Sequence, residues 1–331
     1  MNSLFILRGN MWIKELNYQP IDVLLDSSNA AIEYFTRRDL LDEKVSEVST
    51  LWKLKAAQKI INRQTPEGFW KYPGGNLKLR SQEDYNQLET FRQLGELVEK
   101  YGFNKDHPSI KKAAKFLFSC QSPEGDFRGI YGKQYATTYS SAIMELLIKA
   151  GYQNYPEIEK GFQWLISHRQ NDDGWAIPFR TLKMKYSDAL KLSEPLQSDP
   201  TKPFSHLITG MVLRAFAAHP KYRDSVYAHD AGKLIMDRFF QRDKYADRQD
   251  KKYWESVSFP FWFTNIVTSL DSLYFLGFKK DEPQIKLALD WLIQQQNKDG
   301  TFNLKLLLIR DKDLKYWVTL AICRIFKRYY K

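Results

Sequence analysis

The sequence predicts an all-α fold, an α/α toroid in which two concentric layers of helices are built from about six helical-hairpin repeats. One observation behind this prediction is a loop of the pattern Gln-x-x-x-Gly, followed closely by an aromatic residue. The loop occurs four times, beginning at Gln64, Gln121, Gln170 and Gln296. The other observation is an alternation of helices with one apolar face and helices that are apolar on most sides, which is typical of an outer layer around an inner one.

Each repeat is predicted to begin with an outer helix and to end in the loop. A proline opens this helix in three repeats, at Pro108, Pro156 and Pro283. Proline is favoured in the first turn of a helix because its missing N–H would have no partner there. In one repeat Ile158, Phe162 and Leu165 lie at i, i+4 and i+7, the spacing of one apolar helix face. The loop glycine allows the positive φ that a chain often adopts after a helix.

The inner helices follow the loops. Apolar residues occupy most positions of four such segments, at 135–150, 204–218, 261–276 and 314–326. A helix that is apolar nearly all round is expected to be buried on all sides. The first hairpin of the chain is expected at 21–35 and 45–63.

Three segments depart from the repeat. One repeat is degenerate, because its outer helix is expected at 222–241 but its loop at 243–254 lacks the glutamine and the glycine. An N-terminal extension is expected over 1–19, and an inserted loop over 183–203, where the chain is polar. No linker divides the sequence, so we expect a single toroid domain over 1–331.

The composition narrows the class of protein. The 331 residues are 43% hydrophobic and carry a net charge of +11. This charge fits a solvated basic surface, an anionic ligand or peripheral contact with an anionic membrane. Nucleic acid is not expected, because zinc-finger spacing and RNA-binding aromatic signatures are missing. The two cysteines, Cys120 and Cys323, lie in apolar helical contexts and indicate a reducing, cytoplasmic location.

The repeated loop resembles the glutamine–tryptophan repeat of squalene and hopene cyclases. The helix opening at 135–142, Tyr-Ala-Thr-Thr-Tyr-Ser-Ser-Ala, is similar to inner helices of protein prenyltransferase β subunits. The resemblance extends from about residue 21 to residue 326. It implies a toroid whose central cavity holds an isoprenoid, and it implies less about activity because one fold hosts many functions.

The catalytic motifs of these families are missing from the sequence. No Asp-x-Asp-Asp acid motif occurs, and the nearest carboxylate pair, Asp172 and Asp173, lies inside a repeat loop, where it is expected to cap a helix. Asp271 is an alternative acid if burial raises its pKa, or else a paired core residue. No Asp-x-Cys pair or spaced histidines suit zinc, so we expect no metal and no cofactor.

Basic residues follow each loop and are candidates for holding an anionic head group. They are Lys71 and Arg80, Arg128 and Lys133, Arg180 and Lys183, and Lys305 and Arg310. We single out Arg128 and Arg180 as ligand-binding residues, with ordinary surface charges as the alternative. Arg214 joins them because an arginine among apolar residues needs an acidic partner or an anionic ligand.

Aromatic residues early in the inner helices are candidates for the wall of the cavity. Tyr135, Trp262 and Trp317 are predicted to contact the ligand, and Tyr139 is a candidate catalytic residue. Packing between the two helical layers is the alternative for all of these rings. His206 is a candidate base or a paired core histidine, and Asn265 completes the ligand-binding set.

Three functions remain open at this point. The first is a cyclase- or prenyltransferase-like protein that binds an isoprenoid, or a similar apolar molecule with an anionic head, and that lacks the standard motifs. The second is a non-catalytic toroid that binds lipid or a partner. The third is a carbohydrate lyase on an α/α barrel, for which Arg180, Asn265 and Tyr139 would suit proton transfer.

Overall fold

The computed structural model describes residues 11–75, 77–78, 81–129, 131–307 and 311–331. Its contacts group the chain into two compact units. Unit 1 comprises Met1–Glu47, Ile235–Arg242 and Asp250–Lys331, and unit 2 comprises Val48–Leu234 and Asp243–Gln249. The single domain over 1–331 stays a prediction. Arg80, Arg310 and the first ten residues of the N-terminal extension lie outside the described part of the chain.

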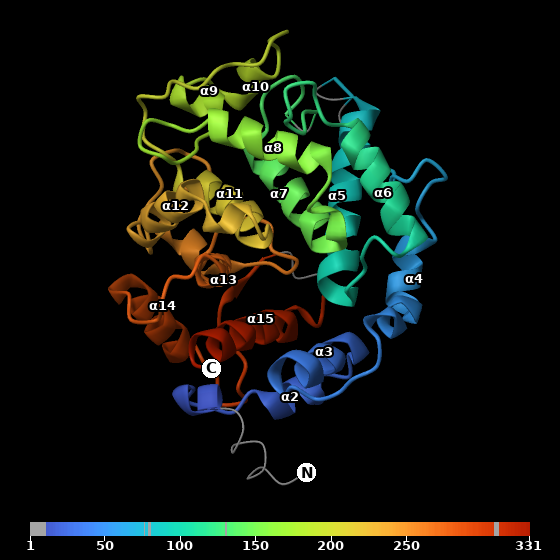
Figure 1. Ribbon diagram of the computed structural model, residues 1–331, viewed down its shortest axis with the longest axis vertical. Helices are drawn as coiled ribbons and strands as arrows, with labels where there is room; N and C mark the ends of the chain where they lie inside the picture. Colours follow the sequence, from blue (N-terminus) through green and yellow to red (C-terminus); the bar gives the residue numbers. More distant parts are fainter. Residues whose placement is uncertain (1–10, 76, 79–80, 130, 308–310) are drawn as a thin grey trace. The chain divides into compact units, whose positions relative to one another are not determined.

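Unit 2 contains a buried layer of three helices that lie side by side (Figure 1). They are α5 (Gln82–Tyr101), α7 (Thr137–Leu147) and α11 (His206–Ala218). Shorter helices pack on the outside of this layer. Among these, α4 (Lys55–Ile61) and α6 (Pro108–Ser119) pack on α5, and α8 (Pro156–Ser167) packs on α7.

The burial of these helices follows the sequence pattern. Every residue of α11 from His206 to Ala217 is buried, whereas α8 buries a single stripe that includes Ile158, Phe162 and Leu165. Unit 2 also contains the short helices α9 (Pro178–Thr181) and α10 (Tyr186–Ala189). Turns of 3₁₀ or π helix occur at Val48–Lys53, Ile148–Tyr152 and Tyr222–Asp224, and α12 (Val226–Met236) follows the last of them.

Unit 1 is arranged around α15 (Leu314–Tyr329), the last inner helix. Packed on α15 are α2 (Ile21–Leu25), α3 (Ala30–Phe35), the π turn Thr36–Leu40, the 3₁₀ turn Met11–Glu15 and α13 (Ile266–Phe275), which also contacts α14 (Pro283–Gln294). A 3₁₀ turn at Lys251–Glu255 leads into β1 (Ser256–Val257), which pairs in parallel with β2 (Lys305–Leu306). Part of the predicted N-terminal extension is thus packed, and Trp12 is only 2% exposed.

The loop glutamine joins consecutive repeats. Gln121 Nε2 donates to the carbonyl of its own loop glycine, Gly125 (2.7 Å), and to the carbonyl of Glu157 at the start of α8 (2.8 Å). Gln64 makes the same pair of bonds, to Gly68 and to Ser109 at the start of α6. One carboxamide therefore closes its loop and holds the next outer helix.

The loop glycine allows the next helix to approach closely. Gly68 and Gly125 have φ values of +101° and +115°, a region that favours glycine. A β-carbon on Gly68 would collide with the carbonyl group of Lys112 in α6, and one on Gly125 with that of Lys160 in α8. Glycine is required at this place both for the turn and for the packing.

The loop aromatic residue contacts both layers. The backbone N–H groups of Trp70, Phe127 and Trp175 donate to the hydroxyl groups of Thr90, Ser140 and Thr209 in the following inner helices, at 2.9–3.1 Å. The indole N–H of Trp70 donates to the carbonyl of Ile60 (2.8 Å), and that of Trp175 to the carbonyl of Leu165 (2.7 Å). A carbonyl near the end of each preceding outer helix thereby gains a partner.

The fourth loop joins the end of the chain to its beginning within unit 1. Gln296 Nε2 donates to the carbonyl of Tyr18 (2.6 Å), and Gln296 Oε1 accepts from the Tyr18 N–H (2.9 Å). A β-carbon on Gly300 would collide with the backbone of Gln19 and Pro20, just before α2. The segment before α2 therefore takes the place that the next outer helix has in the other repeats.

The inserted loop occupies the same place beside the third loop. Gln170 Nε2 donates to the carbonyls of Asp199 (2.7 Å) and Lys202 (3.0 Å). Asp172 accepts from the Phe204 N–H, and Asp173 pairs with Arg169. The two carboxylates thus support the loop and the entry to α11, as expected for acids in a repeat loop.

Several helices are shorter than the sequence pattern indicated. The segment at 21–35 forms two helices, because the Asn29 side chain accepts from the N–H groups of Ala31 and Ile32 and starts a new one. The helix expected at 261–276 begins only at Ile266, where Asn265 forms a capping box with Thr268. In the degenerate repeat, α12 is shorter than the expected 222–241.

The all-α fold class is confirmed, since helices dominate the described residues and the strands have two residues each. The hairpin repeats on which the toroid prediction rests are present in both units. None of the described helices is both long enough and apolar enough to cross a membrane.

Replacing Gln121 by leucine should destabilise unit 2 by about 2 kcal/mol, because two partly buried carbonyls lose their donor at about 1 kcal/mol each. Urea unfolding followed by circular dichroism would measure this. The control is Gln163→Leu, an exposed glutamine on α8, which should change stability by less than about 0.5 kcal/mol. Equal losses in both variants would contradict the role of the loop carboxamide.

Candidate functional site

A surface depression of about 610 Å³ lies at one end of unit 2. Its walls come from the segment before α5, the start of α5, the loop after Phe127 and the inserted loop. The lining residues are Leu77, Lys78, Ser81, Asp84, Arg128, Gly129, Gly132, Lys133, Leu190, Lys191, Leu192 and Ser193. Most of the charged groups are basic, and apolar leucines stand beside them.

Local sequence explains two of these walls. Ser81 and Asp84 form a capping box, in which the Ser81 hydroxyl accepts from the Asp84 N–H and the Asp84 carboxylate accepts from the Ser81 N–H. The second wall is a tight turn in which the Gly132 N–H donates to the Gly129 carbonyl (2.8 Å). Gly129 has a φ of +120° and Gly132 one of +59°, which explains the glycines.

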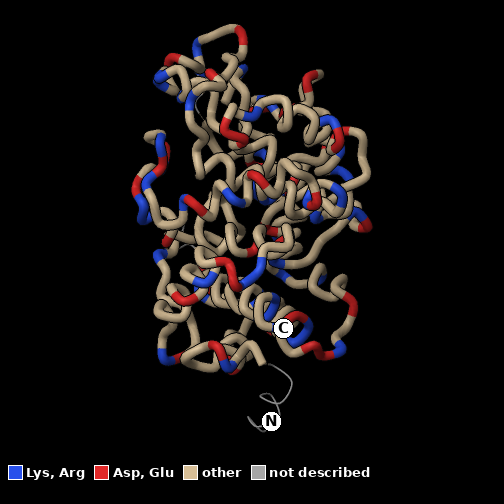
Figure 2. Tube along the Cα trace, turned by 60° about the vertical axis from the view of Figure 1, so that its left-hand side comes forward, with Lys and Arg blue, Asp and Glu red and all other residues tan. Residues whose placement is uncertain are grey.

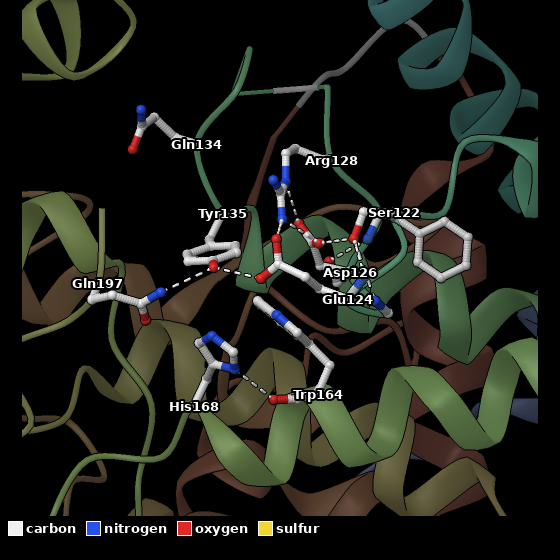
Figure 3. A network of polar contacts seen from close by, with 12 residues as sticks. Ser122, Glu124, Asp126, Arg128, Gln134, Tyr135, Trp164, His168 and Gln197 are labelled. Carbon is white, nitrogen blue, oxygen red and sulfur yellow. Dashed lines mark hydrogen bonds and ion pairs between the residues drawn. The ribbon is translucent and has the colours of Figure 1, made fainter. Parts of the chain in front are cut away.

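Arg128 lies in the depression, but two carboxylates surround its guanidinium group (Figure 3). Arg128 Nη2 lies 2.7 Å from Glu124 Oε1 and 2.9 Å from Asp126 Oδ1, and Nε donates to Asp126 Oδ2 (3.2 Å). Although burial alone would lower the pKa of Arg128, the hydrogen bonds to Asp126 and Glu124 raise it. Asp126 is fully buried, so Arg128 neutralises an acid of its own loop.

Tyr135 connects this loop to the inserted loop. Its hydroxyl donates to Glu124 Oε2 (2.6 Å) and accepts from Gln197 Nε2 (3.0 Å), while Arg128 lies over its ring at 4.8 Å (Figure 3). Burial and the hydrogen bond to Glu124 raise the pKa of Tyr135. The hydrogen bonds that Glu124 accepts from Tyr135 and Arg128 lower the pKa of Glu124. Tyr135 is 2% exposed, and its hydroxyl group links the second repeat loop to the inserted loop.

Tyr139 belongs to an aromatic cluster. Tyr131 meets it edge-on at 5.4 Å, and Phe91 of α5 meets it edge-on at 6.1 Å. Tyr131 also contacts Phe179 (6.2 Å) and Tyr186 (5.8 Å) of the short helices α9 and α10. The three tyrosines are partly exposed and the two phenylalanines are buried. The tyrosine rings are therefore accessible to solvent while they pack on buried phenylalanine rings.

Arg180 and Arg214 have acidic partners. Arg180 binds Asp247 with Nε and Nη2, in a bidentate pair. Arg214 lies 2.8 Å from Glu145 Oε2 across the contact between α7 and α11, and Lys149 binds Glu145 Oε1 at 2.7 Å. Burial opposes ionisation, but Arg214 and Lys149 hold the pKa of the buried Glu145 carboxyl below its usual value.

His206 lies beside a buried carboxylate at the start of α11. Its Nε2 is 3.5 Å from Asp243 Oδ2, and the same oxygen accepts from the Ser205 hydroxyl and the Leu207 N–H at 2.9 Å each. Asp243, from the degenerate loop, therefore caps α11. The Ser205 hydroxyl points to this acid and accepts from the Ile208 N–H, so the group does not form a nucleophilic triad.

Four of the proposed site residues belong to unit 1. Asp271 pairs with Arg328 and its side chain is 36% exposed, so the burial on which its acid role depended is not found. Asn265 is buried and caps α13. Trp317 is 1% exposed and stacks on Phe259 at 5.3 Å, as a core residue does, whereas Trp262 is partly exposed.

The structure offers no ligand set for a metal ion among the described residues, where no three His, Cys, Asp or Glu side chains are grouped suitably. Burial raises the pKa of the Cys120 thiol to about 12, and burial also raises that of Cys323. Neither thiol has the depressed pKa of a nucleophilic cysteine.

Four residues near the depression were not among the predicted site residues: Gln87, Glu124, Tyr131 and Gln197. Glu124 could have been found, because the first loop carries Glu67 at the same position. Gln197 gave no signal in the sequence, since its partner Tyr135 is 62 residues away. Gln87 is a polar residue buried within α5, which no local pattern predicts.

Residues 83–198 match the family model described as the squalene-hopene cyclase C-terminal domain. This segment includes α7, the second and third loops, the aromatic cluster and most of the depression. Over these residues the match confirms the resemblance that the repeated loops indicated. No curated protein sequence matches the chain.

Solved structures also match the chain, at low identity. A variant of the type II terpene cyclase MstE from Scytonema, in complex with geranylgeranyl dihydroxybenzoate, is 13% identical, with 94% of this chain and 98% of that chain covered and a TM-score of 0.46. A polysaccharide lyase is 10% identical, with 98% and 96% covered and a TM-score of 0.49. A protein from Actinoplanes is 14% identical, with 97% and 99% covered and a TM-score of 0.40. These likenesses are too distant to carry an activity.

Replacing Arg128 by alanine should destabilise the protein by about 3–5 kcal/mol, because Asp126 would remain buried without its partner. Arg180→Ala is the comparison, since the Asp247 side chain is 33% exposed and can be solvated. We expect about 1 kcal/mol or less for that variant in urea unfolding. A smaller loss for Arg128→Ala than for Arg180→Ala would contradict the structural role of Arg128.

Replacing Glu145 by glutamine should cost about 3–5 kcal/mol at neutral pH, because Arg214 loses a buried partner. The pKa of folded Glu145 lies below its ordinary value of 4.5, so its stabilisation is present above that pH and is lost as the pH falls through the folded pKa. Unfolding measured from pH 7 to pH 3 should show a constant difference between the two proteins at neutral pH, which narrows as the pH falls below 4.5. Asp188→Asn, in an exposed pair with Lys191, should change little. A constant difference across the range would contradict this account.

Proposed function

We propose that this chain binds an isoprenoid, or a similar apolar molecule with an anionic head group, against the aromatic cluster at the start of α7. The observation that supports this most is the coincidence of two features. The segment that matches the squalene-hopene cyclase C-terminal domain, 83–198, also contains the partly exposed rings of Tyr131, Tyr139 and Tyr186.

The aromatic cluster suits an apolar chain. Phe91 and Phe179 are buried and hold the tyrosines edge-on, so the exposed ring faces are fixed before a ligand arrives. Covering apolar surface of this kind is favourable by about 25 cal/mol per Å². The faces of tyrosine rings also attract cations, which suits a carbocation if the protein performs a cyclisation or a prenyl transfer.

The depression beside the cluster suits an anionic head group. Lys78, Lys133 and Lys191 line it together with a single aspartate, Asp84. Arg128 and Arg180 were the proposed anion ligands, but their pairs with carboxylates are more buried than the exposed pair of Lys191 with Asp188, which makes them poorer candidates. Figure 2 shows Lys and Arg interspersed with Asp and Glu along the chain.

Peripheral membrane contact, at the surface of an anionic cytoplasmic leaflet, is part of the same proposal. Leu77 and Leu192, at the rim of the depression, are 65% and 37% exposed. Lys78 and Lys191 follow and precede them in the sequence. Exposed leucines among lysines suit an anionic lipid surface, from which an apolar ligand could enter.

The carbohydrate-lyase alternative loses its main residues in this structure. Arg180 is bound to Asp247, and Asn265 caps α13. A non-catalytic binding toroid needs the same apolar site as the proposed isoprenoid protein and differs from it only in product formation.

The test is equilibrium binding of geranylgeranyl diphosphate to the full chain, followed by calorimetry. Tyr139→Ala should weaken binding at least about tenfold, equivalent to about 1.4 kcal/mol, because a ring face of the proposed site is lost. Tyr155→Ala is the matched control, since Tyr155 is 43% exposed, stacks on Phe118 outside the site and should bind as the wild type does. Absence of binding by the wild type would refute the proposal.

A further inference from the structure

Gln87 is a buried polar residue for which the described part of the chain offers no hydrogen-bond partner. It lies on α5 and is 1% exposed, and among the described residues neither its Nε2 nor its Oε1 has a partner. A buried carboxamide in this state has lost its water and gained nothing in return, which is costly and therefore uncommon in folded proteins. Such a group needs an explanation beyond the packing of the helix.

The other buried polar side chains around it on α5 do have partners. Asn86 Oδ1 accepts from the Tyr72 N–H (3.1 Å) and from Gln82 Nε2 (2.9 Å). Thr90 Oγ1 accepts from the Trp70 N–H (3.1 Å). Asn86 and Thr90 therefore hold the first repeat loop against α5. The described residues of that loop form no hydrogen bond with Gln87.

Gln87 lies behind the wall of the depression. The position that a β-carbon on Gly129 would take is 3.1 Å from Gln87 Oε1, and a carbon there would collide with the Asp84 carboxylate. Both Gly129 and Asp84 line the depression. The carboxamide therefore lies directly behind the surface that Gly129 and the Asp84 carboxylate give to the depression.

We propose that the ligand of this depression carries a hydroxyl group, and that Gln87 binds this hydroxyl. The proposal rests on the proposed function, because it assigns a polar group to the ligand of the same site. The contact adds a hydrogen-bonding group to the charge interactions of Lys78 and Lys133.

The chemistry of the carboxamide selects this group. Gln87 Nε2 needs an acceptor and Gln87 Oε1 needs a donor. A hydroxyl group supplies both, whereas a diphosphate supplies acceptors only and would leave Oε1 unpaired. Asp84 is a second acceptor beside Gly129, and this also favours a ligand group that can donate.

The experiment measures binding of three probes to the full chain by calorimetry. The probes are geranylgeraniol, geranylgeranyl diphosphate and a neutral soluble oligosaccharide, which separates an isoprenoid alcohol from a carbohydrate as the source of the hydroxyl. The variant is Gln87→Leu, which keeps an unbranched Cβ, supplies an apolar side chain of similar volume and removes both polar atoms. The control is Gln93→Leu, on the same helix, where the glutamine is partly exposed and pairs with Glu89.

We expect Gln87→Leu to weaken binding of the alcohol at least tenfold and to weaken that of the diphosphate much less. The same variant should raise the unfolding temperature of the ligand-free protein, because an unpaired buried carboxamide is replaced by an apolar group. Gln93→Leu should change neither binding nor that temperature. The temperature shift tests Gln87 independently of any ligand.

Equal binding of geranylgeraniol by the wild type and Gln87→Leu would overturn the inference and leave the proposed function standing. A diphosphate that depends on Gln87 as strongly as the alcohol does would overturn the hydroxyl assignment. Failure of both isoprenoids to bind the wild type would refute the proposed function. Binding of the oligosaccharide alone, lost in Gln87→Leu, would retain the hydroxyl assignment and replace the isoprenoid.

Discussion

The double hydrogen bond of the loop glutamine is the interaction on which the rest of this structure depends. In the loops at Gln64 and Gln121, one carboxamide bonds to its own loop and to the start of the next outer helix. The glycine four residues later makes the approach of that helix sterically allowed. Because the bond runs from one repeat to the next, it sets the stacking of repeats as well as the shape of the loop.

The variations of this bond are informative. The third loop has no outer helix directly after it, and Gln170 bonds to the inserted loop. The fourth loop holds Tyr18, so a segment near the beginning of the chain completes the last repeat of unit 1. In the degenerate repeat Asp243 caps α11, and Trp254 still donates its indole N–H to Gln241, as the loop tryptophans do to their outer helices. The physical requirement, a partner for exposed helix ends, persists where the sequence motif is lost.

The same loops determine which charges can serve a ligand. Arg128 is paired with Asp126 and Glu124, because the turn brings the acids of the loop close to its basic residue. Tyr135 is hydrogen-bonded to Glu124 and Gln197. The proposed site consists of the lysines that line the depression, the partly exposed tyrosines and the carboxamide of Gln87. A proposed site built from these residues retains Lys133 of the basic residues that follow the loops, but not the predicted anion ligands Arg128, Arg180 and Arg214.

The sequence by itself determined the helical hairpins and the positions of their loops, because helix periodicity, an opening proline and a loop glycine are local features. It also placed Tyr139 at the start of an inner helix. Only the tertiary structure decided the partners of the polar residues: Arg180 meets Asp247 across 67 residues, and Asp271 is half-exposed beside Arg328. Local sequence cannot specify such pairs, because they depend on which helix ends the folded chain brings together. The lack of a partner for Gln87 among the described residues has the same origin, since burial without pairing is a property of the folded chain.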